Sequence, residues 1–158
     1  MTTSLAELVS AHPLLAGLPG DAVASVAGCA QNVSFAPGDL LLAESDPANT
    51  LYLLRRGRVA IEVHSPGTGP IVIETLDPGA AVGWSWLVPP YRWHFDARAV
   101  DAVGAVAVDG ACLRDKSQAD PALGYELMKR VAGVLLERLQ MTRIRLLDLY
   151  GTGTGSAR

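Results

Sequence analysis

No stretch of this 158-residue sequence approaches the run of roughly 18 apolar residues that a membrane-spanning helix needs, although hydrophobic residues make up 49% of the chain. The first residues also lack the basic region followed by an apolar one that marks a secretory signal. A chain of this length can bury the core of one domain and is too short for two ordinary ones. We therefore expect one soluble, cytoplasmic domain with no membrane association.

The chain has no excess of positive charge. Thirteen Lys and Arg stand against sixteen Asp and Glu, which leaves a net charge of -3. A nucleic-acid surface needs clustered basic residues, because it binds by neutralising phosphates. The one basic cluster lies in the last predicted helix. We therefore expect no direct nucleic-acid partner.

Cysteine and histidine are scarce, which limits metal and redox chemistry. Cys29 and Cys112 lie isolated in apolar stretches, and in a cytoplasmic chain we expect both to be reduced core residues. The three histidines are far apart and form no His-x-His pair, so a metal-dependent enzyme of the cupin type is not indicated. A Gly-x-Ser-x-Gly elbow is also missing. We predict no catalytic residues, no metal site, no cofactor and no enzymatic activity.

Aromatic residues make up only 6% of the chain, yet they are concentrated in one segment. Five of the nine, including all three tryptophans, fall within residues 84–95, beside two prolines, Arg92 and His94. Binding sites for small molecules are concave and mostly apolar, with a few polar groups. This aromatic segment is therefore the leading candidate for a site.

Short runs rich in Val, Ile and Leu predict strands between residues 32 and 108. Turns with Pro and Gly separate these runs at intervals of roughly 8 to 12 residues, which is typical of an antiparallel β-roll or jelly-roll barrel. Residues 58–64 alternate as expected for a strand with one solvent-facing side. The predicted strands are 33–35, 40–43, 51–54, 58–63, 71–76, 94–99 and 103–108.

Helices are predicted on both sides of the roll, so the fold class is mainly β with flanking helices. Residues 4–30 form short helices that cover the roll as a lid, and residues 110–117 form another. Asp120 as cap and Pro121 in the first turn open a long helix over 121–150, about 45 Å in length. The domain thus spans 1–150, and the glycine-rich residues 151–158 are expected to form a flexible tail.

The long helix carries two apolar stripes, and together they exceed what one small roll can cover. One stripe comprises Met128, Val131, Leu135, Leu139, Thr142, Leu146 and Leu149. The other contains Leu136, Gln140, Ile144 and Leu147, with Tyr150 at its end. A parallel coiled-coil contact in a homodimer through this second stripe is the economical interpretation. The alternative is a helix that packs wholly along its own roll.

The order of short helices, an eight-strand roll and a long final helix resembles the cyclic-nucleotide-binding domain of the catabolite-activator type. The resemblance covers about residues 14–150, and it is carried by the segments 35–39, 51–59, 76–83 and 97–99. In that family, a phosphate-binding cassette runs from a Gly-Glu pair, through a short helix, to an Arg followed by a small or hydroxyl residue. The resemblance implies that N–H groups at the helix start hold the cyclic phosphate, that the Arg pairs with its charge and that the Glu accepts from the ribose hydroxyl.

This sequence departs from that cassette at its polar positions. Gly83 matches the glycine, but Trp84 stands at the glutamate position. Trp93 falls at the arginine position and His94 at the next, with Arg92 one residue away, so either Arg92 or Trp93 takes the place of the arginine. Leaving a buried phosphate without its cationic partner costs about 2 to 5 kcal/mol. Binding of cyclic AMP or cyclic GMP in the usual way is therefore not expected.

The sequence thus predicts a stand-alone regulatory or sensory module that binds a small ligand in an altered aromatic pocket and signals through a separate protein partner. Because the chain ends eight residues after the long helix, no DNA-binding domain is expected. In the alternative, aromatic side chains fill the former ligand cavity, and the chain is a ligand-free structural or scaffolding dimer; a barrel enzyme is a third possibility. The predicted ligand-binding residues are Gly83, Trp84, Ser85, Trp86, Arg92, Trp93, His94 and Thr142, the last of which matches the family's base-contacting hydroxyl.

Overall fold

The computed structural model describes residues 3–155 of the chain. Two short helices come first, eight strands follow, and two helices close the chain. The helices are α1 (Leu5–Ala11), α2 (Gly20–Ala27), α3 (Gly110–Ala119) and α4 (Pro121–Gly155). The strands are β1 (Ala30–Phe35), β2 (Leu40–Leu42), β3 (Thr50–Arg56), β4 (Val59–Ser65), β5 (Gly69–Leu76), β6 (Ala81–Val82), β7 (Asp96–Ala99) and β8 (Val103–Asp109).

The strands form two four-stranded antiparallel sheets, ordered β1-β8-β3-β6 and β2-β7-β4-β5. One apolar cluster lies between the sheets, and a second lies between the first sheet and the helices. In β3, Leu53 faces the helices and Leu54 faces the other sheet. The first sheet is thus covered on both sides, which explains why β8 is an almost continuous apolar run rather than an alternating one.

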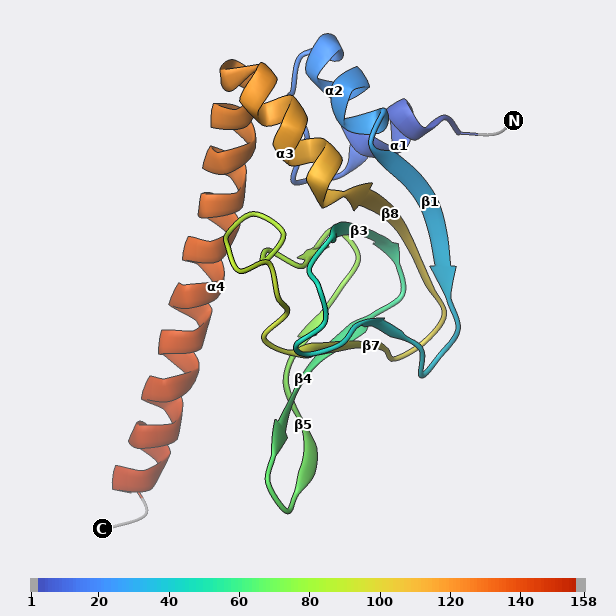
Figure 1. Cartoon of the computed structure of the whole chain (residues 1–158). Coiled ribbons are helices and arrows are strands. Elements are labelled where there is room, and N and C mark those ends of the chain that lie inside the picture. Colours follow the sequence, from blue (N-terminus) through green and yellow to red (C-terminus); the bar gives the residue numbers. More distant parts are fainter. Residues whose placement is uncertain (1–2, 156–158) are drawn as a thin grey trace.

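Helices α1, α2 and α3 gather at one end of the roll, and α4 runs along one side of it and continues beyond (Figure 1). The first half of α4 packs on the domain through Leu123, Leu127 and Val131, all of which are buried. Asp120 caps the helix as predicted, because its Oδ1 accepts from the Leu123 N–H at 3.3 Å. Beyond Val134, α4 leaves large apolar side chains exposed, among them Leu136 and Leu147.

The predicted mainly β fold with flanking helices is confirmed, with four differences in the strands and sheets. The sheets do not close into a barrel, and β6 was not predicted because it is only two residues long. Strand β7 begins at Asp96, so His94 lies before it. The expected solvent-facing side of β4 is wrong for its first half, where Ala60 and Glu62 are buried; Arg98 of β7 lies opposite Ala60 and forms an ion pair with Glu62.

Two predictions for α4 are corrected. The helix continues to Gly155, so the predicted flexible tail is wrong for residues 151–155, and residues 156–158 lie outside the described part. The stripe that packs on the domain contains Val131, as predicted, but its other members differ from the predicted ones. Met128, Leu135 and Leu139 are 50%, 43% and 47% exposed, because the helix buries the face that begins at Leu123 and Leu127 instead.

Cys29 and Cys112 form a disulfide, so the prediction of two reduced core cysteines is wrong. The residues are 83 positions apart, and pairing of β1 with β8 brings them together. Ala30 lies opposite Val108 at the end of this ladder, so the residue before β1 meets the helix that follows β8. Spacing alone could not show this contact.

None of the helices within residues 3–155 combines the length and the apolar character needed to cross a membrane.

Candidate functional site

The cassette between β6 and β7 begins at Gly83, whose position is set by β6. A turn at Asp77 and Gly79 reverses the chain after β5, with the Ala80 N–H donating to the Asp77 carbonyl. The Gly79 N–H donates to the Leu54 carbonyl at 3.0 Å, and β6 then pairs with β3. The cassette therefore starts at the edge of the sheet that the helices cover.

Trp93 lies over Gly83 and fills the space beside it. A Cβ atom built on Gly83 would stand 2.6 Å from Cη2 and 2.8 Å from Cζ3 of the Trp93 ring. Gly83 also has a φ of 97°, a conformation that favours glycine. The indole of Trp93 is 5% exposed and belongs to the core between the two sheets, among side chains such as Val82 and Leu54. The predicted site residues Gly83 and Trp93 are thus in direct contact.

Trp86 belongs to the other core, beneath the helices. Its side chain is 2% exposed, and its Nε1 donates to the Gly83 carbonyl at 3.0 Å. It also packs closely against Gly110 at the start of α3, where an added Cβ would lie 2.7 Å from the Trp86 Cβ. The Arg114 guanidinium of α3 donates to the Trp86 carbonyl. Trp86 therefore joins the cassette to α3.

Trp84 is half-buried and contacts α4. The Arg138 guanidinium carbon lies 5.2 Å from the centre of the Trp84 ring, a distance suited to a cation-π interaction. Nη2 of Arg138 also donates to the Ala81 carbonyl in β6. The Nε1 of Trp84 is buried and has no hydrogen-bond partner. Trp84 and Arg138 thus form the polar contact between the cassette and α4.

Burial lowers the pKa of the Arg138 guanidinium from its ordinary value, while the carboxylates of Glu74 and Glu137 act in the opposite direction. Partial desolvation disfavours the charged form of any side chain, and neighbouring charges of opposite sign restore it. Arg138 is thus a partly desolvated positive charge, and the carboxylates of Glu74 and Glu137 stabilise it. A charge held this way interacts strongly with any ionised group that approaches it.

No helix forms within residues 84–95, where the family has its short cassette helix. These residues form turns instead, and the peptide bond between Pro89 and Pro90 is cis. Tyr91 follows with a φ of 56° and lies beneath the Arg114 guanidinium, 4.2 Å from its ring centre. Backbone N–H groups in turns do not share the common direction of a helix N-terminus.

The remaining predicted site residues lie apart from this contact. Arg92 is exposed and donates from Nη1 to the Ser45 carbonyl at 3.2 Å, and His94 is exposed beside it. Ser85 is half-buried within the turn. Thr142 is exposed on α4, where its hydroxyl donates to the Arg138 carbonyl one turn earlier at 2.9 Å. The structure brings together Gly83, Trp86 and Trp93, and it joins Trp84 to α4.

A cavity of about 420 Å³ lies between α4 and the β5–β6 turn. The turn contributes Gly79, Ala80 and Ala81, and α4 contributes Val134, Glu137, Arg138 and Met141. Pro13, Leu14, Glu74 and Leu76 complete the lining. The walls are mainly apolar, and their charged groups are one arginine and two glutamates. This composition suits a small molecule with both apolar and charged parts.

Sequence reasoning missed Arg138, Glu74 and Glu137. One pattern could have revealed Arg138, since it follows Leu127, Val131 and Val134 at helical spacing and therefore lies on the buried face of α4. A charged residue that continues a buried stripe needs a partner, and its partner here is the aromatic cassette. Glu74 could not be found this way because its approach to α4 depends on the fold.

A second polar cluster lies on the sheet β2-β7-β4-β5, outside the cassette. Glu62 and Asp96 are paired across β4 and β7, and both are buried. Arg98 Nε lies 3.2 Å from Glu62 Oε1, and His64 Nδ1 lies 3.4 Å from Asp96 Oδ2. The Glu44 N–H donates to Asp96 Oδ1 at 2.7 Å. These contacts bind neighbouring strands to each other, and among residues 3–155 no three potential ligands converge as a metal site would require.

Comparison with known proteins identifies a family. The sequence profile described as "Cyclic nucleotide-binding domain" matches residues 32–120. A crystal structure from Geobacter metallireducens GS-15, named for a cyclic nucleotide-binding protein, is 32% identical in sequence, with a TM-score of 0.77. That alignment covers 88% of this chain and 99% of the other.

More distant relatives are regulators. The CRP-like cAMP-activated global transcriptional regulator of Mycobacterium tuberculosis is 26% identical over 146 residues, which cover 92% of this chain. This chain spans about 63% of the length of that regulator. The Thermus thermophilus catabolite activator protein shares the fold, with a TM-score of 0.68 at 22% identity over 87% of this chain and 62% of the other.

Proposed function

Because this chain belongs to the cyclic nucleotide-binding domain family, we propose that it is a regulatory module that senses a small ligand at the contact between its cassette and α4. The observation that carries this proposal is the position of Arg138. Its guanidinium lies over Trp84, donates to Ala81 and borders a cavity of about 420 Å³. A ligand in that cavity would compete for the same guanidinium.

The proposed ligand is a small organic molecule with an apolar part, an anionic group for Arg138 and a positive or hydrogen-bond-donating group for Glu74 and Glu137, which line the same cavity. Arg138 supplies a partly dehydrated positive charge, and Val134, Met141 and Leu76 supply apolar walls. We do not expect this chain to hold a cyclic nucleotide in the family's usual way. Trp93 fills the space beside Gly83, and Trp84 offers no carboxylate to a ribose hydroxyl.

Signalling would follow from a change in the packing of α4. When Arg138 pairs with the ligand, its contacts with Trp84 and the Ala81 carbonyl weaken. The equilibrium between alternative positions of α4 on the domain then shifts. The exposed part of α4 beyond Val134 would carry this change to a homodimer partner through Leu136, Gln140, Ile144 and Leu147, and from there to a separate regulated protein.

The test is a titration followed by both thermal shift and tryptophan fluorescence. The ligands are cyclic AMP, cyclic GMP and a panel of small mono- and dicarboxylates, phosphate esters and amino acids. We expect no response to either cyclic nucleotide and a response to at least one member of the panel. Arg138→Gln should weaken that response about 30-fold or more, as expected for loss of a buried charged partner. The matched control is Arg143→Gln, an exposed arginine of the same helix.

A second candidate is the ligand-free structural or scaffolding dimer. Burial of Trp86 and Trp93, which are 2% and 5% exposed, favours this candidate, because both side chains of the cassette pack into the hydrophobic core. A panel that gives no response in either readout would overturn ligand sensing and favour this candidate. A response that Arg143→Gln and Arg138→Gln weaken equally would also count against the proposed site. Absence of enzymatic activity and a cytoplasmic location stay predictions.

A further inference from the structure

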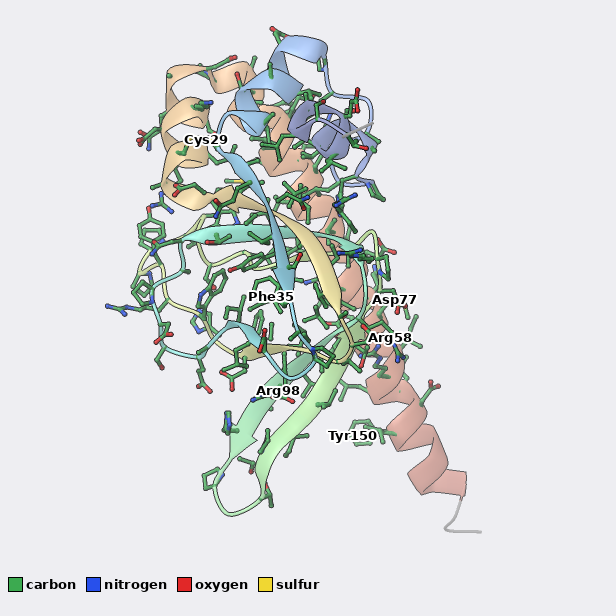
Figure 2. The ribbon with its side chains drawn as sticks, turned by 90° about the vertical axis from the view of Figure 1, so that its right-hand side faces the viewer. Cys29, Phe35, Arg58, Asp77, Arg98 and Tyr150 are labelled. Carbon is green, nitrogen blue, oxygen red and sulfur yellow. A yellow bond between two sulfur atoms is a disulfide. The ribbon has the colours of Figure 1, made fainter. Side chains whose placement is uncertain are left out.

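The disulfide joins two parts of the chain that otherwise belong to different layers. Cys29 stands between α2 and β1, and Cys112 lies in the first turn of α3. Figure 2 places Cys29 where β1 begins, next to α3. The bond therefore fixes α3 to the corner between the N-terminal helices and the sheet.

The bond is open to solvent on one side. An open groove of about 620 Å³ runs past it, and both cysteines line this groove. Cys29 is 9% exposed and Cys112 is half-buried, so Cys112 is the more accessible residue of the pair. The other lining residues are small or polar, namely Gly28, Ala30, Gln31, Thr50, Ala107, Asp109 and Asp115. Thiol-disulfide exchange needs such access for the attacking sulfur.

We propose that the Cys29–Cys112 pair is a redox site that a dithiol protein reduces and that the oxidised, disulfide form of such a protein re-forms by the reverse exchange. The inference is independent of the ligand cavity, because the two sites share no lining residue. Asp109 and Asp115 line the groove, and the ammonium of Lys116 lies beside Gly28 at its edge while it donates to the Ser25 carbonyl at 2.6 Å, so two negative charges outweigh one positive charge there. An acidic groove disfavours glutathione, which carries a net negative charge, relative to a dithiol protein whose approaching surface is neutral or basic.

The exchange balances as a two-electron step. A thiolate of the dithiol attacks the Cys112 sulfur, the Cys29–Cys112 bond breaks, and Cys29 leaves as a thiolate that takes up a proton. The second thiol of the reductant loses its proton and attacks the mixed disulfide. Cys112 is then released and protonated, and the reductant holds the disulfide. Two electrons pass from the dithiol to the cysteine pair.

Reduction would loosen α3 without unfolding the domain. The Asp109 N–H still donates to the Cys29 carbonyl at 2.8 Å, and Lys116 still holds the Ser25 carbonyl. Movement of α3 would be transmitted to the cassette, since Arg114 binds the Trp86 carbonyl and Gly110 packs on Trp86. It would also reach α4, because an added Cβ at Gly124 would lie 2.9 Å from the Ser117 carbonyl oxygen. The redox state of the pair would therefore set the mobility of both elements.

The experiment uses the full chain, oxidised in the folded state, without any ligand. It is exposed either to thioredoxin with its reductase and NADPH or to glutathione at the same thiol concentration. Free thiols are counted by maleimide addition and mass spectrometry, and hydrogen exchange is followed in α3. We expect thioredoxin to reduce the pair about tenfold or more faster than glutathione, with two thiols released together.

The reduced protein should remain folded, with a thermal midpoint about 5 to 15 °C lower and with faster exchange in α3. The double variant Cys29→Ser with Cys112→Ser is the control, and it should match the reduced protein under both conditions. If the two cysteine thiols appear only after denaturation, the proposal is overturned and the disulfide has a purely structural role. Equal rates of reduction by thioredoxin and glutathione would overturn the choice of a dithiol protein as reductant. Unchanged hydrogen exchange in α3 after reduction would overturn the proposed effect of the redox state on α3.

Discussion

The indole of Trp93 lies against the α-carbon of Gly83, so closely that a methyl group on Gly83 would come within 2.6 Å of the ring. The two residues stand at opposite ends of the cassette, ten positions apart. Their contact brings the two ends of the cassette together, and the buried Trp93 side chain occupies the space beside Gly83. The large indole at position 93 can pack here only because position 83 has no Cβ, so the two residues depend on each other.

Replacing Gly83 with Ala should destabilise the protein by about 2 to 4 kcal/mol. One part is backbone strain, because the φ of 97° disfavours any residue with a Cβ. The other part is overpacking against Trp93, which is buried and cannot move away freely. Urea unfolding followed by tryptophan fluorescence measures the change.

Gly38→Ala is the matched control for this substitution. Gly38 has a φ of 90°, but nothing lies within 4 Å of an added Cβ. It should show only the backbone cost, about 1 to 2 kcal/mol. Equal losses for both variants would contradict the Trp93 contact.

Stability should fall as the pH drops below 6.5, and His12 should account for part of the fall. Burial lowers the pKa of this imidazole below its ordinary value of 6.5. Nδ1 accepts from the Leu14 N–H, and Nε2 lies 3.2 Å from the Ala80 carbonyl, so the neutral ring satisfies both contacts. Well above pH 6.5, neither the folded nor the unfolded chain binds a proton at this imidazole, and the full contribution to stability is present.

Below pH 6.5, the unfolded chain gains a proton at His12 that the folded chain does not, until the pH passes the lower pKa of the folded state. The contribution at pH 5.5 is at most about 1.4 kcal/mol. His12→Gln should flatten the dependence of the unfolding free energy on pH between 7.5 and 5.5. His94→Gln changes an exposed histidine and should leave it as in the parent protein. Parallel pH curves for the parent and His12→Gln would exclude this role.

Leu147→Glu should dissociate the homodimer proposed through α4. Leu147 is 69% exposed in the single chain and belongs to the predicted stripe with Ile144. Burying a carboxylate in an apolar helix contact without a partner is strongly unfavourable. Sedimentation equilibrium of the parent and the variant measures the association constant.

The control is Leu149→Glu, because Leu149 is 71% exposed but lies on a different face of α4. This variant should retain the parent association constant. If both substitutions dissociate the protein to the same degree, the stripe is misassigned. A monomeric parent protein would reject the homodimer itself.

Asp96→Ala should destabilise the protein by about 1 to 3 kcal/mol. The substitution leaves the Glu44 N–H without the carboxylate oxygen that it contacts at 2.7 Å, at a position that is 5% exposed. Asp96→Asn keeps an oxygen in that place and should recover most of the loss. Differential scanning calorimetry of the two variants tests this, and equal destabilisation would assign the cost to the lost charge instead.

The secondary structure was largely predictable because each signal is local. Turn residues around Gly38 and Gly79 mark the ends of strands, and Asp120 with Pro121 marks the start of α4. The two-residue β6 escaped prediction because so short a strand has no periodicity of its own. Contacts such as Cys29 with Cys112 escaped because they depend on strand pairing across most of the chain.

The sequence by itself determined that this chain folds as a roll with a long final helix, since hydrophobic periodicity and turn chemistry act over a few residues. It also determined where the cassette lies and which polar residues of the family are missing from it. Only the tertiary structure decided that Trp86 and Trp93 belong to the core, that Trp84 meets Arg138 and that the two cysteines are bonded. These relationships depend on which faces of distant elements meet in three dimensions, and packing of the whole chain sets that geometry.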